Sequence, residues 1–318
     1  MGDVVYRVYR EGDEVAINAS FNRVFGLQRP LDEWRWKFAA EPEGRFIAVA
    51  VDEAGAVLAH YGAVPTRWRL GAMTARTGQI VDAYSVPEVR GRRVFSDLYE
   101  EFVRQLCNPQ GLCVGFGFPG RRHYEMGLRQ LRYIDLGTVP YFHRDVRPDR
   151  LPGPRGVALR TGFDATAVDD LWRRCRDRYP YAALRDAVRV GARFTGRPGV
   201  EYAHLSAWRD GECRAWAVAR PLRGVLRCAD LVWDGRDAGA LASLDGGLQE
   251  AAAQLGCGSC DAWLRSDSEA DRELRRLGWV EAASPEDVVF VARTFHPEID
   301  LEVLRPRLYL TLADSDLV

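Results

Sequence analysis

The sequence lacks long apolar runs and has almost no lysine. No stretch of eighteen or more apolar residues occurs, and polar residues follow Met1, so we expect no membrane span and no secretory signal. Lys37 is the only lysine among 44 basic residues, a bias typical of a GC-rich genome. The net charge of −1 argues against a nucleic-acid partner, because such binders carry a strong basic excess.

Paired cysteines and clusters of metal ligands are also missing. The seven cysteines are an odd number and are scattered through the chain, which favours reduced thiols and a cytoplasmic protein. Cys257 and Cys260 form a C-x-x-C pair, but no second pair and no histidine follows at the spacing of zinc ligands. We therefore expect ordinary core or loop cysteines and no metal.

The length of the chain is sufficient for two domains. A chain of 318 residues exceeds what one hydrophobic core usually organises, and its composition is that of a globular protein. Residues 147–156 hold three prolines and no hydrophobic periodicity, which predicts a linker. We predict a first domain over residues 1–146 and a second over residues 157–318.

Hydrophobic periodicity predicts the same order of elements twice. In the first half we expect helices at 13–26, 31–38, 94–107 and 123–131, and strands at 46–52, 56–66, 68–70, 74–86, 112–118 and 138–143. In the second half we expect helices at 165–178, 238–255 and 269–277, and strands at 202–208, 213–221, 225–233, 259–264 and 287–294. The repeated order suggests a duplication within an α/β (α+β) fold.

The clearest chemical signal is the stretch 78–99, which reads as a strand, a Pro-Glu turn, a basic loop and an amphipathic helix. A loop that leads into a helix directs several N–H groups and the positive dipole end at one spot, an arrangement that suits a pyrophosphate. Arg90, Arg92 and Arg93 add positive charge and bidentate donors. The alternative is a solvated basic turn.

This stretch resembles the GNAT acyltransferases. The phrase VPEVRGRRVFSDL at 86–98 is similar to the family's loop for the pyrophosphate of coenzyme A, and the phrases at 33–38, 59–65 and 115–119 resemble the tandem-domain branch. The resemblance covers about residues 5–145; the second half resembles the family only in layout and in the ending Leu277-Gly278-Trp279. It implies two tandem GNAT-like domains, each a mixed central sheet flanked by helices, with the first binding acyl-CoA and a degenerate second facing the acceptor.

The resemblance also implies which residues bind the donor. They are Tyr84, Ser85, Val86, Arg90, Gly91, Arg92, Arg93, Val94, Phe95 and Ser96, with the amides near Tyr84 to Val86 as donors to an oxyanion. Arg93 and Phe95 stand where the family has a glycine and a small residue, so Arg93 acts either as a side-chain clamp or as a sign of a weakened site. Leu128 occupies the position of the family's usual catalytic tyrosine.

Four residues are candidates for acid–base chemistry, because the attacking amine must be neutral and the leaving thiolate must be protonated. Asp82 suits a base, an anchor for a cationic acceptor, or a simple partner of an arginine. His123 and Tyr124 follow a buried strand and suit protonation of the sulfur. His204 lies on a polar-aromatic strand that would face a cleft between the domains, or it is an ordinary surface histidine.

Bulky aromatic residues are the candidates for substrate contacts. Most of the nine tryptophans should be core or interface residues. We expect some of the following to line a groove for the acceptor or the acyl chain: Trp34, Trp36, Phe118 and Trp208.

These features predict an acyl-CoA-dependent N-acyltransferase that uses acetyl-CoA or a longer acyl-CoA. The acceptor would be the primary amine of a small molecule or natural product, attacking directly in a ternary complex; an amino sugar of a glycopeptide antibiotic is one candidate. The alternative is a non-catalytic module that binds coenzyme A or the acceptor. The acceptor, the acyl length and the oligomeric state are left open by the sequence.

Overall fold

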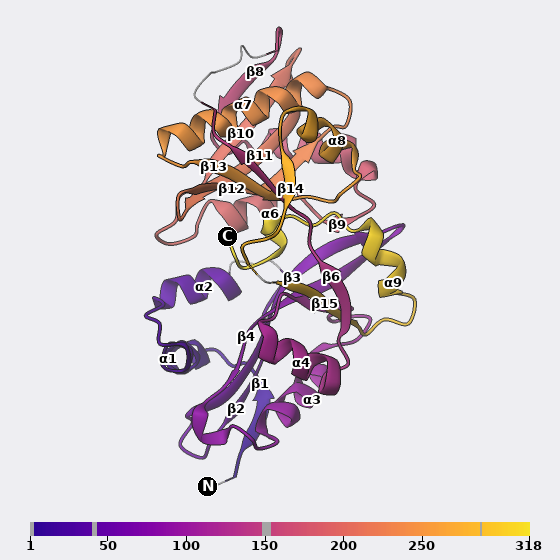
Figure 1. The fold of residues 1–318 in the computed structure, drawn as a ribbon. Coiled ribbons are helices and arrows are strands. Elements are labelled where there is room, and N and C mark those ends of the chain that lie inside the picture. The colour runs from indigo at the N-terminus through magenta and orange to yellow at the C-terminus, as the bar shows by residue number, and fades with distance from the viewer. Residues whose placement is uncertain (1–2, 40–42, 148–153, 287) are drawn as a thin grey trace. The chain divides into compact units, whose positions relative to one another are not determined.

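The computed structural model describes residues 3–39, 43–147, 154–286 and 288–318. The chain divides into two compact units (Figure 1). The first unit consists of Met1–Trp68, Thr74–Gly137 and Val289–Pro306, and the second of Arg69–Met73, Thr138–Val288 and Arg307–Val318. Residues 148–153 of the predicted linker lie outside the described residues.

The first unit is a mixed sheet flanked by helices. Its strands are β1 (Val5–Val8), β2 (Phe46–Val51), β3 (Val57–Leu70), β4 (Met73–Ser85), β5 (Val114–Gly117), β6 (Ile134–Thr138) and β15 (Val289–Thr294), in the order β1-β2-β3-β4-β5-β15-β6. Its helices are α1 (Asp13–Phe25), α2 (Leu31–Ala39), α3 (Val94–Leu106), α4 (Arg121–Gln130) and α9 (Leu301–Leu304). The two segments expected at 56–66 and 68–70 form one strand, β3.

Alternation along β2 builds two cores, one on each face of the first sheet. Ile47 and Val49 pack in a cluster with α1 and α2, whereas Ala48 and Ala50 pack in a second cluster with α3. The α3 residues of that cluster recur at helical spacing, as the sequence predicts; they are Val94, Leu98, Tyr99 and Phe102.

The second unit repeats the plan. Its strands are β7 (Tyr141–Asp145), β8 (Ala158–Thr161), β9 (Tyr181–Ala183), β10 (Ala203–Arg209), β11 (Glu212–Leu222), β12 (Val225–Trp233), β13 (Ser259–Trp263) and β14 (Val280–Ala282). The sheet runs in the order β14-β7-β13-β12-β11-β10-β8. Its helices are α5 (Ala165–Cys175), α6 (Ala187–Phe194), α7 (Ala238–Gln254) and α8 (Glu269–Arg276).

Each unit takes one strand from the other half of the sequence. The strand expected at 138–143 was predicted to complete the first domain. It corresponds to β7, which pairs instead with β13 and β14 in the second sheet. The strand expected at 287–294 begins outside the described residues, and its described part, β15, pairs with β5 in the first sheet. The two halves have exchanged equivalent strands, which the local pattern of either strand cannot reveal.

The described residues contain free thiols, no helix suited to a membrane and no cluster of metal ligands. All seven cysteines carry free thiols, and six of them are buried. Of the helices in the described ranges, none is both long and apolar enough to cross a membrane. Those ranges also contain no group of three or more His, Cys, Asp or Glu placed to hold a metal ion.

Candidate functional site

Strands β4 and β5 separate partway along the first sheet. Their parallel register joins Thr77 to Val114 and ends where Gln79 meets Phe116, yet β4 continues to Ser85. Asp82, in the part of β4 beyond that register, has a φ of 51°, a conformation typical of a β-bulge. The bulge therefore lies where β4 leaves its neighbour.

Three side chains from other elements fix this bulge. The Asp82 carboxylate lies 2.5 Å from Arg29 Nη1 and 2.8 Å from Lys37 Nζ, and its side chain is only 3% exposed. The Asp82 carbonyl accepts a hydrogen bond from His60 Nδ1 at 2.7 Å. Two nitrogens of the cluster, His60 Nε2 and Arg29 Nη2, are buried without a partner among the described residues.

Electrostatics set the protonation of this cluster. Burial alone raises the pKa of Asp82, but Lys37 and Arg29 bring that pKa down to about 2. Burial lowers the pKa of His60 to about 4, so the imidazole is neutral at pH 7. A carboxylate held by two cations accepts a proton poorly, so the geometry favours pairing over the role of a general base.

The basic loop at 90–93 joins β4 to α3 through a short turn. Gly91 has a φ of 82°, and a Cβ added there would meet no atom within 4 Å, so this conformation needs glycine and the backbone lies open. Helix α3 begins at Val94 without a side-chain cap. The amides of its first turn and the positive dipole end are thus left for an outside acceptor.

The arginines of this loop are exposed. The Arg90 N–H donates to the Pro87 carbonyl at 3.2 Å, and the Arg90 side chain has no hydrogen bond or ion pair with a described residue. Arg93 is 78% exposed and lies 3.3 Å from Asp97, on the flank of its own helix. The loop thus combines exposed guanidinium groups with an uncapped helix.

Backbone alternation decides which strand amides face the separation of β4 and β5. The Val86 N–H donates to the Leu58 carbonyl of β3 at 2.9 Å. Neighbouring N–H groups in a strand point to opposite edges, so the Ser85 N–H points away from β3. Of the three expected oxyanion donors, Val86 is engaged within the sheet and Ser85 is the one directed toward the β5 side.

The chain turns back after α4, so the Tyr133 side chain packs against that helix at Gly127. Arg132 adopts a left-handed conformation (φ 57°), and the Tyr133 N–H then reaches the Gly127 carbonyl at 3.0 Å. A Cβ on Gly127 would lie 2.3 Å from the Tyr133 ring, so only glycine permits this approach. The Tyr133 hydroxyl thereby contacts both the Tyr61 hydroxyl and, at 3.3 Å, His123 Nε2.

His123 and Tyr124, adjacent in sequence, meet different surroundings. His123 packs edge-on to Phe95 at the start of α3, and burial lowers its pKa to about 4. Tyr124 donates its hydroxyl to Asp135 at 2.7 Å, and this hydrogen bond raises the pKa of the phenol. Leu128 is exposed on α4. His123 therefore belongs to the buried network and Tyr124 does not.

The sequence did not single out Tyr61, Tyr99, Tyr133 or Arg293. Arg293, on the exchanged strand β15, donates to the Tyr99 hydroxyl at 2.6 Å, and Tyr99 donates to the Leu131 carbonyl. Burial raises the pKa of Tyr99 to about 12. No local signal marks these residues, because their partners come from distant segments of the chain.

The aromatic candidates of the first unit differ in exposure. Trp34 is fully buried and stacks on Tyr9, as a core residue does. Trp36 is half-buried on α2. Phe118, just after β5, is half-buried and stacks on Phe290 of β15 at 5.3 Å. Phe118 thus lies at the end of β5, where that strand leaves β4.

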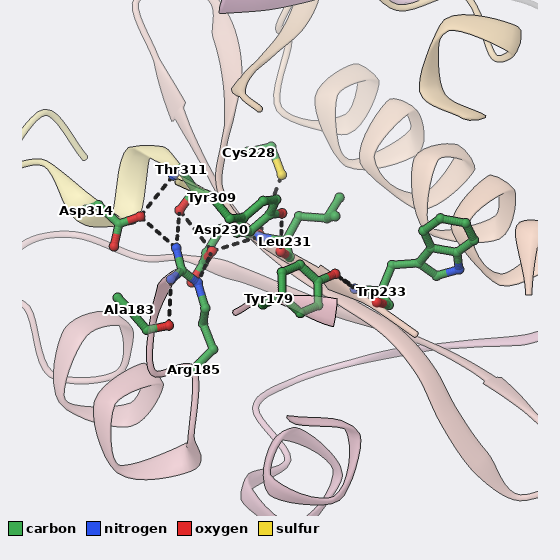
Figure 2. Close-up of polar contacts among 10 residues, drawn as sticks. All are labelled: Tyr179, Ala183, Arg185, Cys228, Asp230, Leu231, Trp233, Tyr309, Thr311 and Asp314. Carbon is green, nitrogen blue, oxygen red and sulfur yellow. Dashed lines mark hydrogen bonds and ion pairs between the residues drawn. The ribbon is translucent and has the colours of Figure 1, made fainter. Parts of the chain in front are cut away.

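In the second unit, β12 carries the equivalent bulge. Its register with β11 skips Ala229, and Asp230 follows. Figure 2 shows Asp230 facing Arg185, which also pairs with Asp314 at 2.7 Å. Burial raises the pKa of Asp230, and the Asp314 charge adds to that effect against Arg185. Two acids share one guanidinium here.

The edge of β12 beyond its bulge is occupied by tyrosines. The register of β12 with β13 ends at Cys228. Beyond it, the Tyr309 hydroxyl donates to the Leu231 carbonyl at 2.7 Å, and the Tyr179 hydroxyl contacts the Trp233 carbonyl at 2.8 Å (Figure 2). These two hydroxyls therefore satisfy backbone carbonyls of β12 beyond its register with β13.

The loop after β12 is satisfied by its own carboxylates. Asp234 accepts the N–H groups of Arg236 and Asp237 at 2.8 and 3.0 Å, and Asp237 caps α7 through the Ala240 N–H. The remaining candidates of this unit lie elsewhere: His204 contacts the Phe194 carbonyl, and Trp208 lies under Arg160. Burial lowers the pKa of His204.

Comparisons with known proteins agree with this layout. Residues 5–127 match the family model described as acetyltransferase (GNAT) domain. A probable N-acyltransferase from Enterococcus faecalis V583 has a TM-score of 0.72 at 12% identity, over 92% of this chain and 73% of that one. A GCN5-related N-acetyltransferase from Kribbella flavida has a TM-score of 0.68 at 17% identity, over 92% and 71%.

A longer match extends through both units. Saccharomyces cerevisiae N-myristoyltransferase, solved with bound myristoyl-CoA, has a TM-score of 0.62 at 12% identity, over 100% of this chain and 90% of that one. A search of the curated proteins gives no match. At these identities the solved structures show the fold, and the fold they share spans both units.

Proposed function

Because residues 5–127 match the acetyltransferase (GNAT) domain model and the fold of both units is shared with solved N-acyltransferases, we propose that the chain is a tandem GNAT-type N-acyltransferase, that its first unit binds acyl-CoA and that the acyl group passes to a primary amine. The observation that carries this proposal is the uncapped start of α3 beside the exposed arginines of the loop at 90–93. Amide donors, a helix dipole and guanidinium groups together suit a pyrophosphate.

We assign the reacting end to the separation of β4 and β5. The Ser85 N–H would donate to the thioester oxygen as it becomes negative, because it points away from β3. The amine nitrogen forms the new bond to the carbonyl carbon, the carbon–sulfur bond breaks, and the proton lost by nitrogen balances the one gained by sulfur. Arg29, Lys37 and His60 would act as positioning residues that fix the bulge.

Proton transfer is assigned to His123 with Tyr133 as its positioning partner. Tyr124 is less suited, because Asp135 already accepts its hydroxyl proton in a hydrogen bond. Asp82 is less suited as an anchor for a cationic amine, because two cations already hold it. The unpartnered Arg29 Nη2 would instead donate to a hydrogen-bond acceptor, whereas the unpartnered His60 Nε2, which carries no proton when Nδ1 donates to Asp82, would accept a hydrogen bond.

Thiol release tests the proposal. Acetyl-, octanoyl- and decanoyl-CoA would each be offered with a panel of amines that includes the amino sugars of glycopeptides. Release that requires an amine and falls in Arg90→Ala/Arg92→Ala supports the enzyme, and the amine that works identifies the acceptor class. Binding of coenzyme A without turnover across the panel would favour the non-catalytic module, which the exposed Leu128 motivates.

Compartment is part of the same proposal. Seven free thiols, six of them buried, favour a reducing compartment, so we place the reaction in the cytoplasm. A role in antibiotic biosynthesis depends on the acceptor and is decided by the amine panel.

A further inference from the structure

A pocket of the second unit lies where β12 ends and β13 has already left it. Three arginines line it, Arg178, Arg265 and Arg307, from three separate segments of the chain. All of its lining residues belong to the second unit. The proposed donor site of the first unit does not use this pocket.

The pocket also has aromatic walls. Tyr179, Trp233 and Tyr309 line it and are each at least nine-tenths buried. The two hydroxyls are hydrogen-bonded to the β12 backbone (Figure 2). The Trp233 Nε1 donates to the Asp237 carbonyl. With their polar atoms engaged, these side chains offer ring carbons to an occupant.

The guanidinium groups are only partly used. Arg178 pairs with Glu269, Arg265 donates to the Arg307 carbonyl at a long 3.4 Å, and Arg307 donates to Tyr181. Each guanidinium has five N–H donors, so most remain for another partner. Glu269 is the only acid among the lining residues, which leaves a net positive charge.

We propose that this pocket binds a planar organic anion, a carboxylate or phosphate attached to an aromatic ring. The rings would contact the flat group, and Arg265 and Arg307 would hold the anionic group. The inference goes beyond the acyl transfer proposed above and does not depend on it. Glu269 competes with such a ligand for Arg178, so removing the Glu269 charge should strengthen binding of the ligand.

Calorimetric titration with phenyl phosphate, benzoate, inorganic phosphate and phenol tests the inference on the whole chain. We expect one of the aromatic anions to bind more tightly than both inorganic phosphate and phenol. Arg265→Gln/Arg307→Gln should weaken that binding at least about tenfold, since two charge-assisted contacts are lost. Arg173→Gln, an exposed arginine on α5, should leave it unchanged.

Glu269→Gln supplies the sharper test, because it should tighten binding several-fold by releasing Arg178. Coenzyme A as a further probe shows whether a nucleotide end is one source of the anion: its binding would then share the dependence on Arg265 and Arg307. The inference is overturned if no aromatic anion saturates the protein, if the double variant binds as the wild type does, or if Glu269→Gln weakens binding. Thiol release is measured separately, so failure here leaves the donor site intact.

Discussion

In both units a bulged strand leads through a loop into a helix. The two junctions differ in whether side chains of the protein accept the N–H groups of that loop and helix. In the first, the loop at 90–93 carries three arginines and α3 has no side-chain cap. In the second, Asp234 and Asp237 accept the N–H groups of the loop after β12 and of the first turn of α7. The second junction thus contains its own anionic groups, whereas the first has N–H donors and positive charge available for an anionic ligand.

The charges around the two bulges also differ: cations outnumber acids in the first unit, and acids outnumber cations in the second. Asp82 is shared by two cations, Arg29 and Lys37. Asp230 instead shares one cation, Arg185, with a second acid, Asp314. The same backbone irregularity can thus be held by a surplus of charge of either sign. Of the two junctions, which both lie within the described residues, the first combines positive charge with open backbone donors.

The largest expected effect concerns the arginines of the first loop. Arg90→Ala/Arg92→Ala should raise the KM for acyl-CoA by about a hundredfold or more, because each charge-assisted phosphate contact contributes about 1.5–3 kcal/mol. The matched control is Arg236→Ala in the second loop, which should leave the KM unchanged. An equal rise in both variants would remove the distinction between the loops.

The next effect concerns the bulges. Asp82→Asn leaves two buried cations without their anion and should lower the stability of the first unit by about 3–5 kcal/mol. Asp230→Asn should cost the second unit less, about 1–2 kcal/mol, because Asp314 still pairs with Arg185. Hydrogen exchange in urea, followed on peptides from each unit, measures both; equal losses would contradict the charge comparison.

Acid should act on the first bulge alone. The folded-state pKa of Asp82, about 2, lies below its ordinary value of 3.8, so its stabilisation is complete above that value and is lost as the pH falls toward 2. The pKa of Asp230 is raised, so its protonation relieves a buried charge instead. Asp82→Asn should therefore reduce the loss of first-unit stability between about pH 4 and pH 2; part of the loss remains, because, against the effect of burial, ion pairs also lower the pKa values of Asp13 and Glu43. An undiminished loss in the variant would show that Asp82 does not contribute to it.

A smaller effect is expected at the glycines of the two loops. Gly91→Ala should cost about 1–2 kcal/mol from its positive φ alone, since nothing lies near the added methyl group. Gly235→Ala, also at positive φ, should cost slightly more, because its Cβ would lie 2.0 Å from Arg178 Nε and displace that side chain from Glu269. Urea unfolding measures both; a larger loss in Gly91→Ala would mean that the first loop is closed.

The smallest effect is an absence of response. Burial keeps His123 neutral down to about pH 4, so kcat should show no inflection from this histidine between pH 5 and pH 8. An inflection near pH 6.5 that His123→Asn removes would contradict the buried environment.

Local patterns predicted the longer elements, because each is set by nearby residues. The bounds of β12 agree with the expected 225–233, and α3 begins at Val94 as predicted. Short elements were missed: strands β1, β6, β8, β9 and β14 and helices α6 and α9. Most residues of β6 and β8 are exposed, so their apolar alternation is weak. The basic loop was predictable for the same reason: strand, turn and helix follow one another in sequence.

Long-range pairing was not predictable. The exchange of β7 and β15 leaves each strand's own pattern unchanged and alters only its neighbours. Asp82 drew attention through its position, but Arg29 and Lys37 reach it from 53 and 45 residues away. The contact of His123 with Tyr133 depends on the left-handed Arg132, a conformation that the residue type does not indicate.

Hydrogen–deuterium exchange with and without coenzyme A tests the contrast between the two junctions most directly. Because the first junction has open amides and the second does not, the coenzyme should slow exchange in peptides covering residues 84–97 and leave those covering residues 229–240 unchanged. Protection confined to residues 229–240, or none in either segment at saturating ligand, would contradict the assignment of the donor to the first unit.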